Sequence, residues 1–389
     1  MKKFPAVLIS DGSLWNVLFS TINFDCLELV ALYGDIDQFN LTTRQKLEVI
    51  FHPIECFGKE CKNYKDTYFI FNCFGDKIRG YLGDCGIDRQ YIISLEYPEP
   101  GNFRMLLTYY AQWKFLKRNK PAIDFFTTGI SFTRDGFDVS SMLPYKGITL
   151  AFLMQDMYYS YKMAQAYLSN CIPVNTDQSI KFCIMGLAPY QFQLKLCHKS
   201  LNYDEIIYIP ILGHDEMEYK DTKRGNFLRE ILSSKYFRIL EDFELSEINF
   251  SDIDGQRAFL AQDSFKISTF ERLDLENEYR IYRKKYPETV EFNLKCLEDY
   301  LNLLHKHNIV PFGVLFPFSV PGRRAYPAES VREFRDLLFR FKDKMQFIDL
   351  WDMNLPNSNY RNVSHLNISG SKITTFAIKK AVDAYFGNV

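Results

Sequence analysis

The chain has 389 residues, 47% of them hydrophobic and 16% aromatic, which is enough apolar material for two folded domains. Its 47 basic and 48 acidic residues nearly cancel, so composition argues against nucleic acid or an anionic membrane as the main partner. Nine cysteines and six histidines show no zinc-like spacing, which predicts reduced thiols and no metal site. No apolar run reaches the ~18 residues of a membrane span, and the run after Met1 is too short for a secretion signal. We therefore expect a cytoplasmic protein without a transmembrane segment.

Residues 1–118 alternate short apolar strands with helical segments, the pattern of a small parallel sheet with crossover helices. This predicts a Rossmann-like first domain with strands at 4–10, 27–33, 68–73 and 91–94. Its first strand-to-helix turn reads Asp11-Gly12-Ser13 and lacks the G-x-G-x-x-G that brings a pyrophosphate to a helix start. A structural or partner-binding domain is thus favoured over a nucleotide-binding one.

Residues 119–389 are predicted to form a second α/β domain with a mostly helical insertion at 198–283, where the periodicity weakens and charge rises. Right-handed crossovers would bring the loops after its strands to one sheet edge, so residues more than 200 positions apart can share a site. The predicted strands are 124–128, 148–153, 180–185, 309–316 and 346–350, and the predicted helices are 156–168, 286–305, 330–341 and 369–385.

Two stretches at this edge carry groups used in acyl chemistry. Ser131 follows the first of these strands in a Gly129-Ile130-Ser131 turn, and His365 stands in a Ser-His-Leu-Asn loop before the last helix. Alone, a Gly-x-Ser turn is most often structural, and it is the pairing with the histidine loop that suggests a nucleophile and its base.

Together with other blocks, these residues resemble the SGNH/GDSL hydrolase superfamily, in particular the DltD-like proteins of bacterial surface-polysaccharide clusters. The resemblance covers about residues 120–389 and implies a flavodoxin-like three-layer α/β/α fold. It also implies attack by Ser131 with His365 as general base, and an oxyanion hole at the backbone of Gly129, Ser131 and Gly186. The remaining supporting blocks are 286–293, 315–317, 347–350 and 365–367.

One position departs from the family pattern: Asn362 stands where the family has an aspartate, three residues before the histidine. An asparagine oxygen can fix the imidazole tautomer but cannot neutralise an imidazolium; in serine proteases the equivalent change costs about 10⁴ in kcat. Three interpretations stay open. Asp349 or Asp352 replaces the missing carboxylate, a slow Ser-His-Asn site operates, or only a binding pocket remains.

Four further residues at the same edge have alternative roles. Arg323 and Arg324 either clamp a phosphate or carboxylate of a substrate or form a solvated turn. Asp156 either caps a helix or binds substrate. Arg134 either shapes the pocket or pairs with Asp135.

The first functional hypothesis is a serine-dependent O-acyltransferase or esterase, most simply an O-acetyl enzyme, acting on a sugar of a capsule, other surface polysaccharide or glycoconjugate. No cofactor is expected to bind tightly, acyl-CoA is a possible donor, and docking to polysaccharide-biosynthesis proteins is a possible partnership. The alternatives are an inactive glycan-binding or assembly module, and a transferase that uses a nucleotide-activated donor such as a nucleotide sugar.

Overall fold

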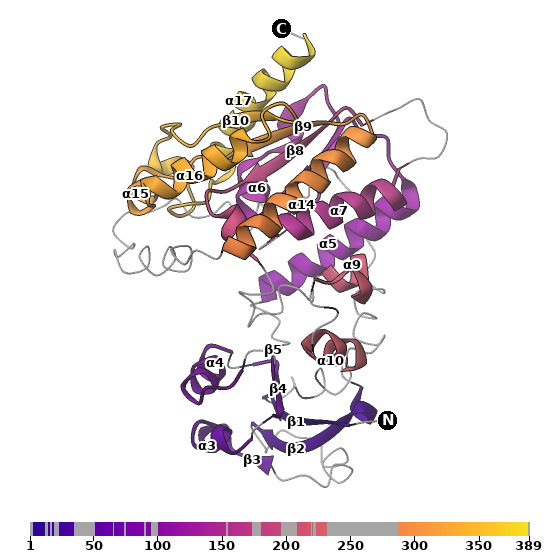
Figure 1. Cartoon of the computed structure of the whole chain (residues 1–389), viewed down its shortest axis with the longest axis vertical. Helices are drawn as coiled ribbons and strands as arrows, with labels where there is room; N and C mark the ends of the chain where they lie inside the picture. Colours follow the sequence, from indigo (N-terminus) through magenta and orange to yellow (C-terminus); the bar gives the residue numbers. More distant parts are fainter. Residues whose placement is uncertain are drawn as a thin grey trace. The chain divides into compact units, whose positions relative to one another are not determined.

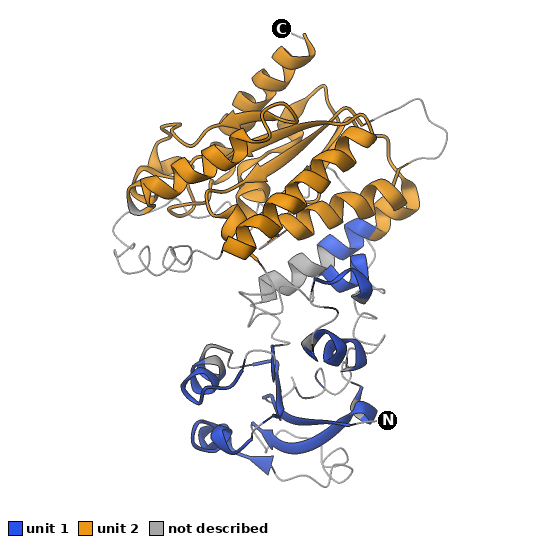
Figure 2. Ribbon diagram, in the orientation of Figure 1, with its two compact units in different colours: residues 1–113, 197–245 blue, residues 114–196, 246–389 orange. Residues whose placement is uncertain are grey.

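The computed structural model describes residues 3–34, 51–94, 100–195, 208–231 and 287–387, apart from short gaps at 12–14, 16–17, 19–22, 65, 74, 89–90, 153–154, 173–179, 219 and 221–222. It is an α/β protein with two five-stranded sheets, and every strand pair in them is parallel. The chain divides into two compact units (Figures 1 and 2), residues 1–113 with 197–245 and residues 114–196 with 246–389. Among the described helices, none is both long and apolar enough to cross a membrane.

The first unit is built on a parallel sheet of order β3-β2-β1-β4-β5. This order reverses direction at β1, as in a Rossmann-like half, and confirms the predicted parallel layout. β3 has only two residues, too few to show periodicity, which is why the sequence did not predict it. The elements are β1 (Phe4–Ile9), β2 (Leu27–Tyr33), β3 (Phe51–His52), α3 (Ile54–Glu60), β4 (Tyr68–Phe71), α4 (Gly75–Asp84) and β5 (Ile92–Ser94).

A short segment from the middle of the chain belongs to this first unit. It contains α9 (Ile209–Leu212) and α10 (Lys223–Ile231). The buried ring of Phe227 stacks on Tyr68 with centroids 3.6 Å apart and meets Phe4 edge-on at 5.2 Å. The sequence analysis had treated 198–283 as an insertion of the second domain, whereas these contacts place α10 on the first sheet. Residues 232–286 lie outside the described part of the chain, as does most of the Asp11-Gly12-Ser13 turn.

The second unit has the strand order β10-β9-β8-β6-β7. Numbered from β6, this is 2-1-3-4-5, the flavodoxin-like doubly wound order, with its switch point between β6 and β8. α5 (Pro100–Asn119) crosses from the first unit into the second. Most of the predicted ranges agree within about two residues, but β7 is shorter than predicted, α6 was not predicted, and α15 occupies a segment predicted as a loop. The elements after α5 are β6 (Phe125–Thr128), α6 (Ser131–Gly136), β7 (Gly147–Thr149), α7 (Met157–Asn170), β8 (Phe182–Leu187), α14 (Pro287–Lys306), β9 (Val310–Leu315), α15 (Val320–Ala325), α16 (Ala328–Phe339), β10 (Gln346–Asp349) and α17 (Ile368–Phe386).

The central strands of this sheet are buried, and helices pack on them. β6 and β8 are buried along their length, with the rings of Phe125 and Phe182 stacked 4.9 Å apart. α14 and α7 lie side by side (Figure 1), and Tyr300 of α14 hydrogen-bonds Thr128 at 2.8 Å across the core. α17 packs against α6. This packing fixes the carboxyl end of β6, where the candidate site begins.

Candidate active site

The turn that carries Ser131 at the end of β6 depends on Gly129. Its φ of +126° is disfavoured for other residues, and a Cβ there would lie 2.6 Å from the carbonyl oxygen of Gly186. The Gly129 N–H donates to the buried Gln155 Oε1 at 2.7 Å, and this hydrogen bond fixes the backbone of the turn. The chain therefore leaves the strand at a set angle and starts α6 at Ser131.

Helix α6 then packs directly on the sheet through Thr133. The side chain of Thr133 occupies the place where a Cβ of Gly186 would be, only 1.5 Å from its Oγ1. This close approach of α6 to β8 requires glycine at position 186. It seats Ser131, the first residue of the helix, at the strand end with its side chain partly exposed.

The histidine reaches the serine from a tightly hydrogen-bonded loop between β10 and α17. Tyr360 and Leu366 form an antiparallel bridge, and the N–H of Arg361 donates to the carbonyl of His365 at 2.8 Å. Ser319, in the loop after β9, donates its hydroxyl to the Val363 carbonyl at 2.7 Å. The loop is thus held to the neighbouring strand end as well as to itself.

These elements bring the predicted pair together. Ser131 Oγ lies 2.8 Å from His365 Nε2, although the two residues are 234 positions apart. On the other side of the ring, Nδ1 lies 3.0 Å from Asn362 Oδ1 and 3.2 Å from Ser364 Oγ. With the proton on Nδ1, Nε2 can accept the serine hydroxyl, which is the geometry of a nucleophile and its base.

The orientation of the Asn362 amide follows from its other bonds. Its Oδ1 accepts the backbone N–H groups of Ser364 at 3.0 Å and His365 at 2.8 Å. Two N–H donors need an acceptor, so the oxygen and not the NH₂ group faces the imidazole. Asn362 thereby selects the histidine tautomer without contributing a negative charge.

Neither carboxylate expected to replace that charge reaches the ring. Asp349 and Asp352 both bind Arg335 on α16, at 2.7 and 3.1 Å, and Asp352 is 76% exposed. Asp349 also accepts the Trp351 N–H at 3.0 Å. Of the three open interpretations, the one in which Asp349 or Asp352 replaces the missing carboxylate does not fit, because both side chains bind α16 and not the His365 loop.

A different carboxylate, Asp135 on α6, is buried beside the site. Its two oxygens bind Arg134 Nε at 2.6 Å and Arg361 NH2 at 2.8 Å. Burial alone would raise the pKa of this carboxyl, but the charge and hydrogen bond of Arg134 and the charge of Arg361 lower it, and a protonated His365 would lower it further. Asp135 therefore stays ionised at neutral pH.

The imidazole itself is held neutral. Burial lowers the pKa of His365 to about 4, with Asp135 opposing the shift and Arg361 and Arg134 adding to it. Phe132 contributes an apolar wall, its ring centroid 4.8 Å from the imidazole. A neutral histidine can act as general base over the whole physiological pH range, but the protonated form is costly here.

The expected oxyanion hole is only partly present. The Gly129 N–H is bonded to Gln155, and Gly186 lies within β8, in register with Val314 and covered by Thr133. Neither glycine therefore supplies a donor at the serine, contrary to the expectation. Ser131 remains, because the first N–H groups of a helix have no acceptor within the helix.

The other predicted site residues have structural partners. Asp156 caps α7 by accepting the Tyr159 N–H at 2.9 Å, and Arg134 pairs with Asp135. Arg323 donates to the carbonyl of Trp351, just after β10, at 3.0 Å. Arg324 is exposed. The interpretations as a cap, an ion pair and a turn fit these contacts better than substrate binding.

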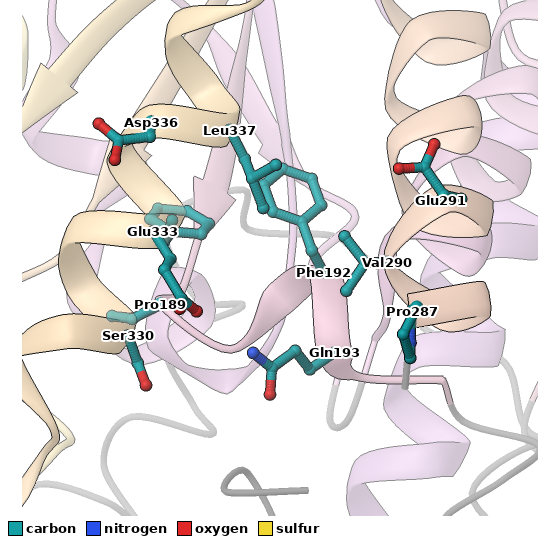
Figure 3. Close-up of a pocket in the computed structure, with 11 residues that line it drawn as sticks. Pro189, Phe192, Gln193, Pro287, Val290, Glu291, Ser330, Glu333, Asp336 and Leu337 are labelled. Atoms are coloured by element: carbon teal, nitrogen blue, oxygen red, sulfur yellow. The ribbon is translucent and has the colours of Figure 1, made fainter. Parts of the chain in front are cut away.

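A pocket of about 490 Å³ opens between α14 and α16 (Figure 3). Its floor is apolar, with Phe192 and Leu337 facing each other, and its rim carries Glu291, Glu333 and Asp336. The described residues that line it include three carboxylates and no cationic side chain. The loop that forms the floor also carries Tyr190, whose ring packs 6.1 Å from that of Phe132, next to Ser131.

From the sequence, Asp135 was considered only as a partner of Arg134 or a pocket residue, and Arg361 and Gln155 had no predicted role. The spacing of Asp135, four residues after Ser131 in a helix, was a usable signal, because such residues share a helix face. Arg361 and Gln155 gave none, since their partners are far away in sequence. No protein-family model matches the chain, and a search of curated proteins found no match either.

Proposed function

We propose that this protein is a serine-dependent acyltransferase or esterase with Ser131 as nucleophile and His365 as general base. The observation that carries the proposal is the 2.8 Å contact between Ser131 Oγ and His365 Nε2, with Nδ1 fixed by Asn362 at 3.0 Å. The site stands at the switch point of a doubly wound sheet, where such folds bind ligands.

The reaction proceeds in two steps. Ser131 Oγ attacks the acyl carbonyl while its proton passes to His365 Nε2, and the Ser131 N–H helps to bind the developing oxyanion. The leaving group takes the proton from Nε2 and departs, leaving an acyl-serine. An acceptor hydroxyl or water then gives its proton to His365 Nε2 and attacks the acyl-serine; the bond to Ser131 Oγ breaks, and His365 returns the proton to that oxygen, which releases the product and restores free serine and neutral histidine.

A sugar hydroxyl as acceptor, in a bacterial surface polysaccharide or glycoconjugate, is supported by the resemblance to DltD-like SGNH proteins. The pocket between α14 and α16 is compatible with it, because carboxylates such as Glu291 and Asp336 accept hydrogen bonds from sugar hydroxyls. The same carboxylates repel phosphate, which disfavours this pocket as the binding place for a nucleotide-activated donor.

The direct assay measures hydrolysis of activated acetyl esters, and acetyl transfer from acetyl-CoA to mono- and oligosaccharides. We expect wild-type turnover that is lost in Ser131→Ala. The control is Ser358→Ala, which alters an exposed serine of a nearby turn and should leave the rate unchanged. Equal rates in wild type and Ser131→Ala contradict the proposal.

A second candidate, a glycan-binding module without turnover, is favoured by the neutral Asn362 and by the two glycines that supply no oxyanion donor. It predicts saturable binding of an oligosaccharide together with a Ser131 that does not react with fluorophosphonates. Binding by calorimetry and labelling by mass spectrometry separate the two functions.

A further inference from the structure

The catalytic pair lacks an acid in its usual position, yet a buried carboxylate lies on the nucleophile's own helix. Asp135 is one helical turn beyond Ser131 in α6, and its side chain is only 1% exposed. Because it is withdrawn from water, its charge acts on neighbouring groups with little screening. Asp135 keeps its negative charge within a buried cluster with Arg134 and Arg361, which both bind it.

Arg361 connects this carboxylate to the histidine loop. Its guanidinium binds Asp135 at 2.8 Å, and its backbone N–H donates to the carbonyl of His365, also at 2.8 Å. A single residue thus joins α6 to the loop that presents the imidazole. The same helix is held to α17, which follows that loop, because Thr374 donates its hydroxyl to the carbonyl of Gly136 at 2.5 Å.

The charges around the imidazole come from three described residues: Asp135 and Arg134 on α6, and Arg361 on the histidine's own loop. Of these, the Asp135 carboxylate acts most strongly on the pKa of His365 and is the one that raises it. The ring's direct hydrogen bonds go to the neutral groups of Ser131, Asn362 and Ser364.

We propose that Asp135 is a positioning residue that replaces the missing acid of the triad: its buried carboxylate stabilises protonated His365 and, through Arg361, holds the histidine loop against α6. This inference rests on the proposed acyl chemistry at Ser131. The proton still moves only from Ser131 Oγ to His365 Nε2 and on to the leaving group, and Asp135 stays ionised throughout.

The first test measures the pKa of His365 by NMR, in protein with isotope-labelled histidine, and needs no substrate. The measurements are made in an Asn362→Asp background, where the added carboxylate brings the His365 pKa into an accessible range. Adding Asp135→Asn is expected to lower that pKa by about one unit, as expected for loss of a nearby opposite charge. The matched control adds Asp138→Asn, which removes a buried carboxylate that binds Ser140 and Ser141, and should leave the pKa unchanged.

Asp135→Asn leaves two arginines facing one neutral group and can prevent folding. The variant Arg134→Gln/Asp135→Asn, in the same background, removes one charge of each sign and keeps a bond partner for Arg361. It is expected to shift the pKa in the same direction by a smaller amount. An unchanged pKa in whichever of these variants folds overturns the proposal.

The second test measures the rate at which a fluorophosphonate labels Ser131. Asp135→Asn is expected to slow labelling at least ~10-fold, and Asn362→Asp in the same chain to restore most of it, because a carboxylate returns beside the ring. Because Asn362→Asp also speeds labelling in an otherwise wild-type chain, the assignment predicts a larger fold gain from Asn362→Asp in the Asp135→Asn chain than in the wild type. A purely structural Asp135 predicts the same fold gain in both chains, and that outcome contradicts the assignment. If the pKa shift is found but Ser131 forms no acyl-enzyme, the electrostatic role of Asp135 stands and the proposed function fails.

Discussion

At the scale of single residues, His365 is well placed as a general base, but its protonated form is only weakly stabilised. Ser131 and His365 have the contact distance of a working pair, and three hydrogen bonds fix the Asn362 oxygen that orients the ring. Asn362 contributes no charge, however, so the protonated histidine depends on groups beyond its own hydrogen bonds. This balance predicts slow chemistry that one substitution can accelerate.

Asn362→Asp should increase the rate of Ser131 acylation. The aspartate enters the same cradle of N–H groups from Ser364 and His365 and adds the charge that stabilises the imidazolium. We expect a gain of at least about tenfold, within the ~10⁴ span of the reverse change in serine proteases. Burst kinetics with an activated acetyl ester measure it. An unchanged or lower rate in a folded variant would show that charge at this position does not limit the reaction.

The pH dependence should reflect the lowered pKa of His365. Since the pKa falls from its ordinary 6.5 to about 4, the unfolded chain binds a proton between these values that the folded chain does not. The unfolding free energy should therefore be fully present above pH 6.5 and decline as the pH falls toward 4. Denaturant titrations at pH 7, 5.5 and 4.5 measure this decline, and His365→Gln should show a smaller one. Asp135, whose pKa is also lowered, adds a further loss near and below its ordinary 3.8.

At the scale of elements, a strand, a glycine turn and a short helix place the nucleophile. β6 was predictable from its apolar run, and the Gly129 turn from its sequence. The close packing of α6 on β8 could not be predicted, because it depends on Thr133 filling the space above Gly186, and these two residues are 53 positions apart. The sequence analysis therefore read Gly186 as a loop donor, when it is a packing position inside a strand.

Gly186→Ala should displace α6. Its Cβ would overlap the Thr133 side chain, and such overpacking costs about 1–3 kcal/mol of unfolding free energy. We expect a lower Tm and slower labelling of Ser131. The control is Gly80→Ala on α4, where a Cβ meets nothing within 4 Å and the change should stabilise the helix by about 0.5–1 kcal/mol. Equal behaviour of the two variants would contradict the packing argument.

At the scale of the whole molecule, alternation of strands and helices predicted two parallel sheets and the strands and longer helices of the second unit, but not its short helices α6 and α15. It did not predict that α10 belongs to the first unit, because that assignment depends on contacts between residues far apart in sequence, such as Phe227 with Tyr68 and Phe4. The acid of the site was misassigned for a related reason. The loop at Asp349 and Asp352 lies at the correct sheet edge, but the direction of their side chains is set by Arg335 on another helix.

Phe227→Ala should selectively weaken the first unit. Removing a fully buried ring costs about 3–5 kcal/mol and leaves a cavity against Tyr68 and Phe4. Hydrogen exchange should accelerate in the peptides of β1 and β4. Phe339→Ala, at a ring that is 64% exposed on α16, is the matched control and should change little. Unchanged exchange in β1 and β4 would mean that α10 does not support this sheet.

The central claim is that Ser131 is an activated nucleophile. The most direct measurement is intact-protein and peptide mass spectrometry after treatment with a fluorophosphonate, in wild type, Ser131→Ala and His365→Gln. The account predicts one adduct on Ser131 in the wild type, none in Ser131→Ala, and much slower labelling in His365→Gln. A wild-type Ser131 that stays unlabelled, or that reacts equally fast without His365, would contradict it.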